Sequence, residues 1–161
     1  MFLPEEQWTP RCGATFFTVR IRQHITVPAP RRDRCGIAKE IAKQVDTFEA
    51  EDECSLLGFC RVNKRRYPSV YYEIEVRRGR ERRTCFRRYS QFCRLASLLD
   101  PDGKRGLRRE LPRKTCALQK EDVQLNERMA ELDAFLTGLL GRVEYVGNPV
   151  IEQFLELDDN C

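Results

Sequence analysis

A strand and a helix meet without a linker in residues 85–92, Cys-Phe-Arg-Arg-Tyr-Ser-Gln-Phe. A basic strand is predicted near residues 81–88, and a helix from about residue 90 to residue 99 follows it at once. An arginine held at such a corner can present its planar donor fork to a phosphate, while the neighbouring Tyr89 packs against whatever carries that phosphate. The apolar positions of the helix are Phe92, Leu95, Leu98 and Leu99.

A β-hairpin is predicted to lead into this corner. Residues 69–77 alternate between apolar and polar side chains, as expected for a half-buried strand. We predict a three-residue loop at 78–80, which sets Tyr72 opposite Phe86 and gives both faces compatible neighbours. In that register Arg88 lies on the buried, helix-covered face, where a charge requires an anion-binding pocket.

Two more helices are predicted after a basic loop. Asn126 is expected to cap the first of them, and Gly141 to end it. Asn148 followed by Pro149 is typical of the start of the second. Three antiparallel strands followed by helices form an α+β fold, with its first strand expected at residues 55–63.

The first 53 residues are interpreted as an extension outside this domain. Residues 14–27 alternate as a strand, with Gln23 as the one fault, and residues 36–49 have helical spacing. The acidic stretch 49–53 is taken as the boundary, so the domain is expected to span 54–158 and to bind its ligand without the extension.

The net charge of +4 conceals a strong asymmetry. Residues 61–114 carry 18 basic and 6 acidic side chains, a net +12, whereas residues 115–161 carry 3 basic and 10 acidic side chains, a net −7. A basic region of this strength predicts a polyanionic partner, either a nucleic acid or an anionic membrane surface.

Other classes of function are disfavoured. The chain has eight cysteines without a Cys-x-x-Cys pair and a single histidine, His24, so we expect no metal site and no cofactor. With that lone histidine and no phosphate loop or nucleophile motif, we expect no enzyme. No apolar run could span a bilayer and no export signal is apparent, which favours a cytoplasmic protein.

Three motifs together resemble the phox-homology (PX) family of phosphoinositide-binding domains. The first is residues 87–92, Arg-Arg-Tyr-Ser-Gln-Phe. The second is residues 127–140, which are similar to the family's E-R-x-x-x-L-x-x-F-L helix, and the third is the reduced proline segment at 111–114, Leu-Pro-Arg-Lys. The resemblance covers about residues 54–157, and the chain is similar to small single-domain sorting nexins.

The resemblance implies a binding site for a lipid headgroup. By this similarity Arg88 binds the 3-phosphate of a phosphatidylinositol, Tyr89 supports the inositol ring, Lys114 meets the 1-phosphate and Arg128 bonds the ring hydroxyls. Arg128 is expected in the first turn of its helix, where the dipole disfavours a cation and a bound anion would relieve the conflict. Residues implied to contact the membrane are Tyr67, Cys116, Ala117 and Leu118.

The function expected from these observations is recruitment to endosomal membranes through phosphatidylinositol 3-phosphate, as a peripheral membrane protein that takes part in trafficking and sorting. Two alternatives stay open. A PX fold can serve protein contacts alone, or the arginine-rich hairpin at 77–83 can bind nucleic acid. The second is disfavoured because no aromatic residues interleave with the hairpin arginines as stacking platforms.

Overall fold

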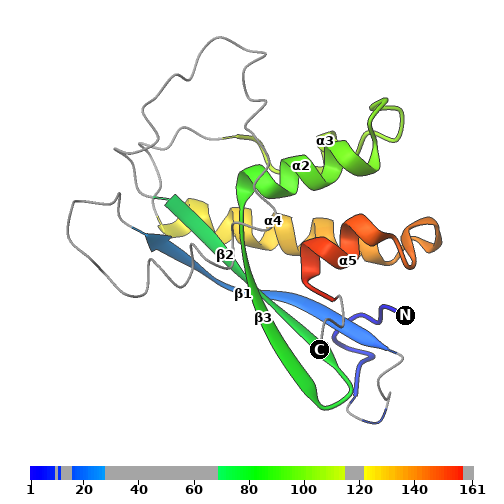
Figure 1. Cartoon of the computed structure of the whole chain (residues 1–161). Helices are drawn as coiled ribbons and strands as arrows, with labels where there is room; N and C mark the ends of the chain where they lie inside the picture. The colour runs from blue at the N-terminus through cyan, green and yellow to red at the C-terminus, as the bar shows by residue number, and fades with distance from the viewer. Residues whose placement is uncertain (10, 12–15, 28–68, 115–121, 158–161) are drawn as a thin grey trace.

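The computed structural model describes residues 1–9, 11, 16–27, 69–114 and 122–157 (Figure 1). Their strands form one antiparallel sheet in the order β1-β2-β3, where β1 is Phe17–Val27, β2 is Ser69–Arg78 and β3 is Glu81–Arg88. The helices follow the strands in the chain, so the predicted α+β class with a three-stranded antiparallel sheet is confirmed.

The first strand of the sheet comes from the N-terminal region. β1 pairs with β2 from Phe17 opposite Arg78 to Val27 opposite Ser69, and it buries Val19 and Ile21 in the core. The prediction that this strand lies in an extension outside the sheet is therefore wrong. The predicted strand at 55–63, the predicted helix at 36–49 and the boundary at residue 53 lie outside the described residues.

β1 contains a bulge at the fault seen in its sequence pattern. Ile21 pairs with Ile74 and Gln23 pairs with Glu73, so Arg22 is an extra residue in the strand. A bulge of this kind exchanges the faces of the residues that follow it. As a result His24 lies opposite Tyr72 and shares its face of the sheet, whereas the unbroken alternation predicted it on the polar face.

The β2–β3 hairpin differs from its predicted register by one residue. Arg78 pairs with Glu81, so the loop is the two-residue Gly79-Arg80, and Gly79 has a positive φ of 59°. A glycine with positive φ at the first loop position is the arrangement of a type II′ turn, which suits a two-residue hairpin. The shift places Arg87, not Arg88, on the face of Tyr72, and this face is the buried one.

In the part of the chain that the structure describes, five helical segments follow the sheet. They are α2 Tyr89–Leu99, α3 Leu107–Glu110, α4 Asp122–Leu140, the 3₁₀ turn η4 Val143–Tyr145 and α5 Pro149–Leu155. The predicted cap of α5 is confirmed, because the Asn148 side chain accepts a hydrogen bond of 2.9 Å from the Val150 amide. The predicted cap of α4 is wrong: Asn126 lies inside the helix, whose buried stripe already includes Leu125.

The helices place the core on one face of the sheet. α4 packs along β1, while α2 packs against the other two strands and against α5 (Figure 1). At the centre, the Phe92 ring meets Tyr72 and Phe154 edge-on, with centroids 6.1 and 5.2 Å away. No described helix is both long enough and apolar enough to pass through a bilayer.

Candidate functional site

The two adjacent arginines at the end of β3 have different surroundings. Arg87 is completely buried and donates three hydrogen bonds: from Nε to the Phe154 carbonyl at 2.8 Å, from Nη1 to the Phe86 carbonyl at 2.9 Å and from Nη2 to Glu156 Oε1 at 2.7 Å. These bonds join the end of β3 to the C-terminal end of α5. Arg87 is therefore an internal anchor of the fold.

Arg88 lies on the opposite face, at the N-cap of α2. Its backbone amide donates to Gln91 Oε1 at 2.7 Å, and its guanidinium lies over the Tyr71 ring, 5.8 Å from the centroid. The amides at the start of a helix attract an anion, and the half-buried arginine beside them adds a full positive charge. The corner thus combines two sources of anion affinity without burying the arginine.

Tyr89 and Arg128 bring two further segments to this corner. The Arg128 guanidinium lies over the Tyr89 ring, 5.2 Å from the centroid, and the side chain is only 7% exposed. Its Nη2 donates to the Arg113 carbonyl at 3.1 Å, and the Tyr89 hydroxyl donates to the Pro112 carbonyl. The start of α2, residues 112–114 and α4 therefore meet around one tyrosine.

The charge state of the tyrosines follows from their burial. Burial raises the pKa of Tyr89 well above its ordinary value, Cys93 adds to the rise, and Arg128 and Arg108 oppose it. Burial also raises the pKa of Tyr72, again against the charge of Arg128. Both hydroxyls stay protonated at neutral pH, so the cations of the corner are not offset by phenolate charge.

A short helix that the sequence pattern did not predict brings Arg108 close enough to Tyr89 to affect the pKa of its hydroxyl. Where a basic loop was expected, Leu107 is fully buried and begins α3. The Asp100 carboxylate accepts the Arg105 and Leu107 amides at 3.2 and 3.3 Å and so fixes the turn between α2 and α3. Burial alone would raise the pKa of Asp100, but these backbone bonds hold it below its ordinary value.

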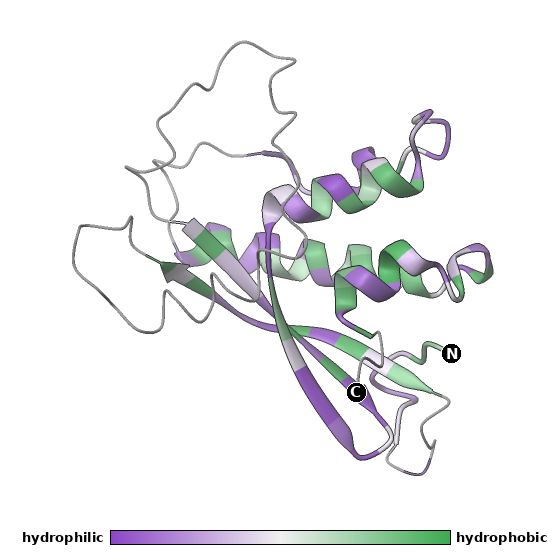
Figure 2. Cartoon of the chain, viewed as in Figure 1, coloured by the Kyte–Doolittle hydropathy of each residue, from purple (hydrophilic) through white to green (hydrophobic). Residues whose placement is uncertain are grey.

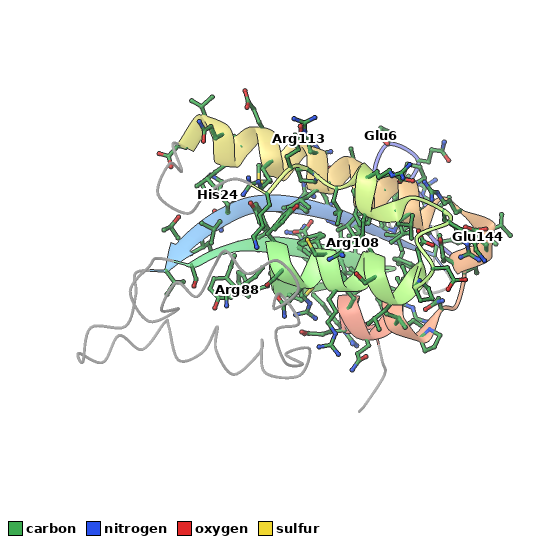
Figure 3. The ribbon with its side chains drawn as sticks, turned by 90° about the horizontal axis from the view of Figure 1, so that it is seen from above. Glu6, His24, Arg88, Arg108, Arg113 and Glu144 are labelled. Atoms are coloured by element: carbon green, nitrogen blue, oxygen red, sulfur yellow. The ribbon has the colours of Figure 1, made fainter. Side chains whose placement is uncertain are left out.

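The predicted site residues fall into three groups. Tyr89, Arg128 and the segment ending in Lys114 lie together, and Arg88 directly precedes Tyr89 in the chain. In Figure 3, Arg88 and Arg108 lie on the side of α2, and Arg113 lies on the side of α4. Arg128 lies in the second turn of α4, so the dipole argument made for it is wrong. The predicted membrane contacts Tyr67, Cys116, Ala117 and Leu118 lie outside the described residues.

Sequence reasoning missed several groups that hold the site together. The carbonyls of Pro112 and Arg113 carry no side-chain signal, because any residue has a carbonyl. Gln91 could have been found, since a glutamine three residues after an N-cap has the spacing of a capping box. The described residues hold no cluster of His, Cys, Asp and Glu able to bind a metal ion.

Comparison with known proteins identifies the fold. A family model described as PX domain matches residues 75–158. The chain belongs to the PX-domain family. The X-ray structure of a designed CISK-PX domain superimposes with a TM-score of 0.53 at 20% identity, covering 86% of this chain and 97% of that one. At this identity the likeness shows the fold alone, and a comparison with curated proteins finds no match.

Membership of the PX-domain family confirms the resemblance inferred from residues 87–92 and 127–140. It indicates phosphoinositide binding and peripheral association with a membrane. The individual residue roles within the corner around Tyr89, and the choice among phosphoinositides, are not decided by family membership.

Proposed function

We propose that this PX domain binds phosphatidylinositol 3-phosphate and so recruits the protein to endosomal membranes for trafficking and sorting. The observation that carries the proposal is the convergence on Tyr89 of α2, residues 112–114 and α4. Three segments distant in sequence meet at one aromatic ring, with the Arg128 guanidinium over it and Arg88 next to it in the chain, in a protein whose family binds phosphoinositides.

Each residue of the corner has a role under this proposal. Arg88, at the start of α2, grips the 3-phosphate with its planar fork and is helped by the helix amides. Tyr89 supports the inositol ring and Arg128 bonds the ring hydroxyls. Lys114, which is exposed, meets the 1-phosphate at the membrane side.

Selectivity follows from the number of cations with assigned phosphates. One arginine serves the 3-phosphate and one serves the hydroxyls, which leaves no dedicated cation for a phosphate at position 4 or 5. Exposed arginines add attraction to any anionic surface, at about 1 kcal/mol for each cation near the surface. We therefore expect a preference for the monophosphate over a background of unselective binding.

Sedimentation with a panel of phosphoinositide vesicles tests this function. We expect the strongest binding to vesicles with the 3-phosphate lipid, and salt should weaken binding to generic anionic vesicles more than this selective binding, because exposed charges are screened. Tighter binding to bisphosphorylated or trisphosphorylated lipids at physiological salt contradicts the 3-phosphate assignment. Absence of binding to every vesicle favours a PX fold that serves protein contacts alone.

A further inference from the structure

The tip of the β2–β3 hairpin, residues 77–83, forms a basic surface apart from the Tyr89 corner. It contains five arginines and one glutamate, and it projects beyond the helices as a hydrophilic end of the sheet (Figures 1 and 2). The side chains of Arg82 and Arg83 are 63% and 45% exposed. The headgroup proposal assigns no role to this surface.

The ion pairs within the tip are exposed and long, so a carboxylate of a binding partner can replace the glutamate in each of them. Arg82 Nε lies 3.3 Å from Glu75 Oε2, and Arg83 Nη2 lies 3.4 Å from Glu81 Oε2. Exposed pairs at such distances contribute little to stability. Glu75 is closer to Arg22 and Arg77, at 2.8 and 2.6 Å. If Arg82 leaves Glu75 to bind another carboxylate, Glu75 therefore still has two cationic partners.

The outer edge of β3 adds backbone groups to this charge. Arg78 and Glu81 close the two-residue loop, and the residues that close such a loop are hydrogen-bonded to each other. Hydrogen-bonded and non-hydrogen-bonded pairs alternate along an antiparallel ladder, so the other odd-numbered residues of β3 also bond to β2 through their backbone. The amides and carbonyls of Arg82 and Thr84 therefore point away from β2. Consistent with this alternation, the Phe86 carbonyl accepts the side chain of Arg87. Among the described residues no strand lies beyond β3.

The position and composition of the tip decide what kind of partner fits. β3 runs from the tip to Arg88, so the tip lies about 25 Å from the headgroup corner along the strand. Residues 77–83 contain no aliphatic or aromatic side chain, hence no apolar group to enter a bilayer and no aromatic ring on which bases could stack. Unpaired strand backbone between cations is complementary to an extended acidic peptide.

We propose that the hairpin tip, residues 77–83, and the outer edge of β3 bind an acidic protein segment as an added strand. The segment's backbone pairs with Arg82 and Thr84, and its carboxylates at successive positions meet Arg82 on one face of the sheet and Arg83 on the other. Because this surface is separate from the corner around Tyr89, one molecule can hold a membrane lipid and an acidic protein together.

Binding of a short labelled peptide with glutamates at successive positions, and hence on both faces of a strand, to the full chain, measured by fluorescence anisotropy at physiological salt, tests the charge contribution. The triple variant Arg80→Gln, Arg82→Gln, Arg83→Gln should weaken binding by about tenfold, from the loss of three exposed charge contacts. The matched control Lys104→Gln, Arg108→Gln, Arg109→Gln removes the same charge elsewhere and should leave peptide binding unchanged. Equal losses in both variants overturn the proposal.

Two further measurements test strand addition and the choice of partner. The same peptide N-methylated at every residue keeps its charge but has no amide hydrogen to donate to β3 from either of its edges, so it should lose most of its binding; equal binding by the methylated peptide overturns strand addition. The hairpin variant should still bind 3-phosphate vesicles and should melt as the parent does. If it loses vesicle binding as strongly as peptide binding, or if duplex DNA displaces the peptide at lower concentration, the acidic-segment proposal is wrong.

Discussion

At the scale of single residues, the adjacent Arg87 and Arg88 have different roles: Arg87 is buried and holds the fold together, whereas Arg88 is half-buried at the proposed headgroup site. Successive residues of a strand face opposite sides, so a register shift of one decides which arginine the core receives. The motif in the sequence identified the pair but assigned the buried place to Arg88. Arg87 holds that place because the loop has two residues, and its three hydrogen bonds satisfy the buried guanidinium.

We predict that Arg87→Ala destabilises the protein by about 3–5 kcal/mol, because it removes the three hydrogen bonds that the buried guanidinium donates to Glu156 and to the Phe154 and Phe86 carbonyls. Arg88→Ala should leave the free energy of unfolding nearly unchanged, since Arg88 is only half-buried. Urea denaturation of both variants checks this contrast. Similar destabilisation by the two substitutions would show that the register is not the one described.

We also predict that Arg88→Ala removes selective binding to vesicles carrying phosphatidylinositol 3-phosphate, at a cost of about 1.5–3 kcal/mol for a charged hydrogen-bonded contact. Arg88→Lys should restore little of it, because an ammonium group cannot reproduce the bidentate fork. The exposed Arg109 supplies the control: Arg109→Ala removes one surface cation and should weaken only the unselective part. Retention of selectivity in Arg88→Ala refutes the role assigned to this residue.

At the scale of elements, one carboxylate of α4 is hydrogen-bonded to β1 at its bulge. Asp133 Oδ1 accepts the Ile21 amide at 2.7 Å, beside the extra residue of the strand. Burial raises the pKa of Asp133 above its ordinary value, although the Ile21 amide opposes the rise. A raised carboxyl pKa means that the folded state binds the proton more tightly, so this group's contribution to stability falls as the pH rises through the folded pKa.

We therefore predict different results for two substitutions at Asp133. Asp133→Asn keeps an oxygen acceptor for the Ile21 amide without the cost of burying a charge, so stability at neutral pH should be equal or slightly higher. Asp133→Ala leaves the amide without its partner and should cost about 1–3 kcal/mol. Thermal or urea unfolding at pH 7 separates them, and a large loss in the asparagine variant would show that the charge itself is needed.

Glu75 should give the opposite pH dependence on the outer face of the sheet. Burial alone would raise the pKa of Glu75, but its hydrogen bonds with Arg22 and Arg77 hold it below the ordinary value of 4.5. A lowered carboxyl pKa contributes stability above the ordinary value, and this contribution is lost as the pH falls through the folded pKa. We predict that Glu75→Gln lowers stability at pH 7 and flattens the acid limb of the stability curve, whereas the exposed control Glu131→Gln leaves the curve unchanged.

At the scale of the whole molecule, the sequence predicted what is local and missed what is distant. The strand-to-helix corner, both ends of α2, the start of α5 and the α+β class depend on neighbouring residues, and they were predicted. The partner of β1 depends on a pairing across 41 intervening residues, 28–68, and alternation alone does not say which strand an amphipathic strand joins. That Arg128 and Tyr89 belong to one site was inferred only through resemblance to the PX family, and their direct contact was not predicted.

The place of β1 leads to a prediction about the whole fold. A chain that starts at residue 52 lacks β1, so it exposes Ile74 and Val76 and removes the surface on which α4 packs. We expect this truncated chain to lose cooperative unfolding and vesicle binding together. Within the full chain, Ile21→Ala should cost about 2–5 kcal/mol, because Ile21 is buried opposite Ile74, whereas Ile25→Ala, beyond the bulge and only half-buried, should cost clearly less. Circular dichroism during urea titration measures both effects. A truncated chain with a sharp transition and undiminished vesicle binding would instead show that β1 is an addition to a domain that folds without it.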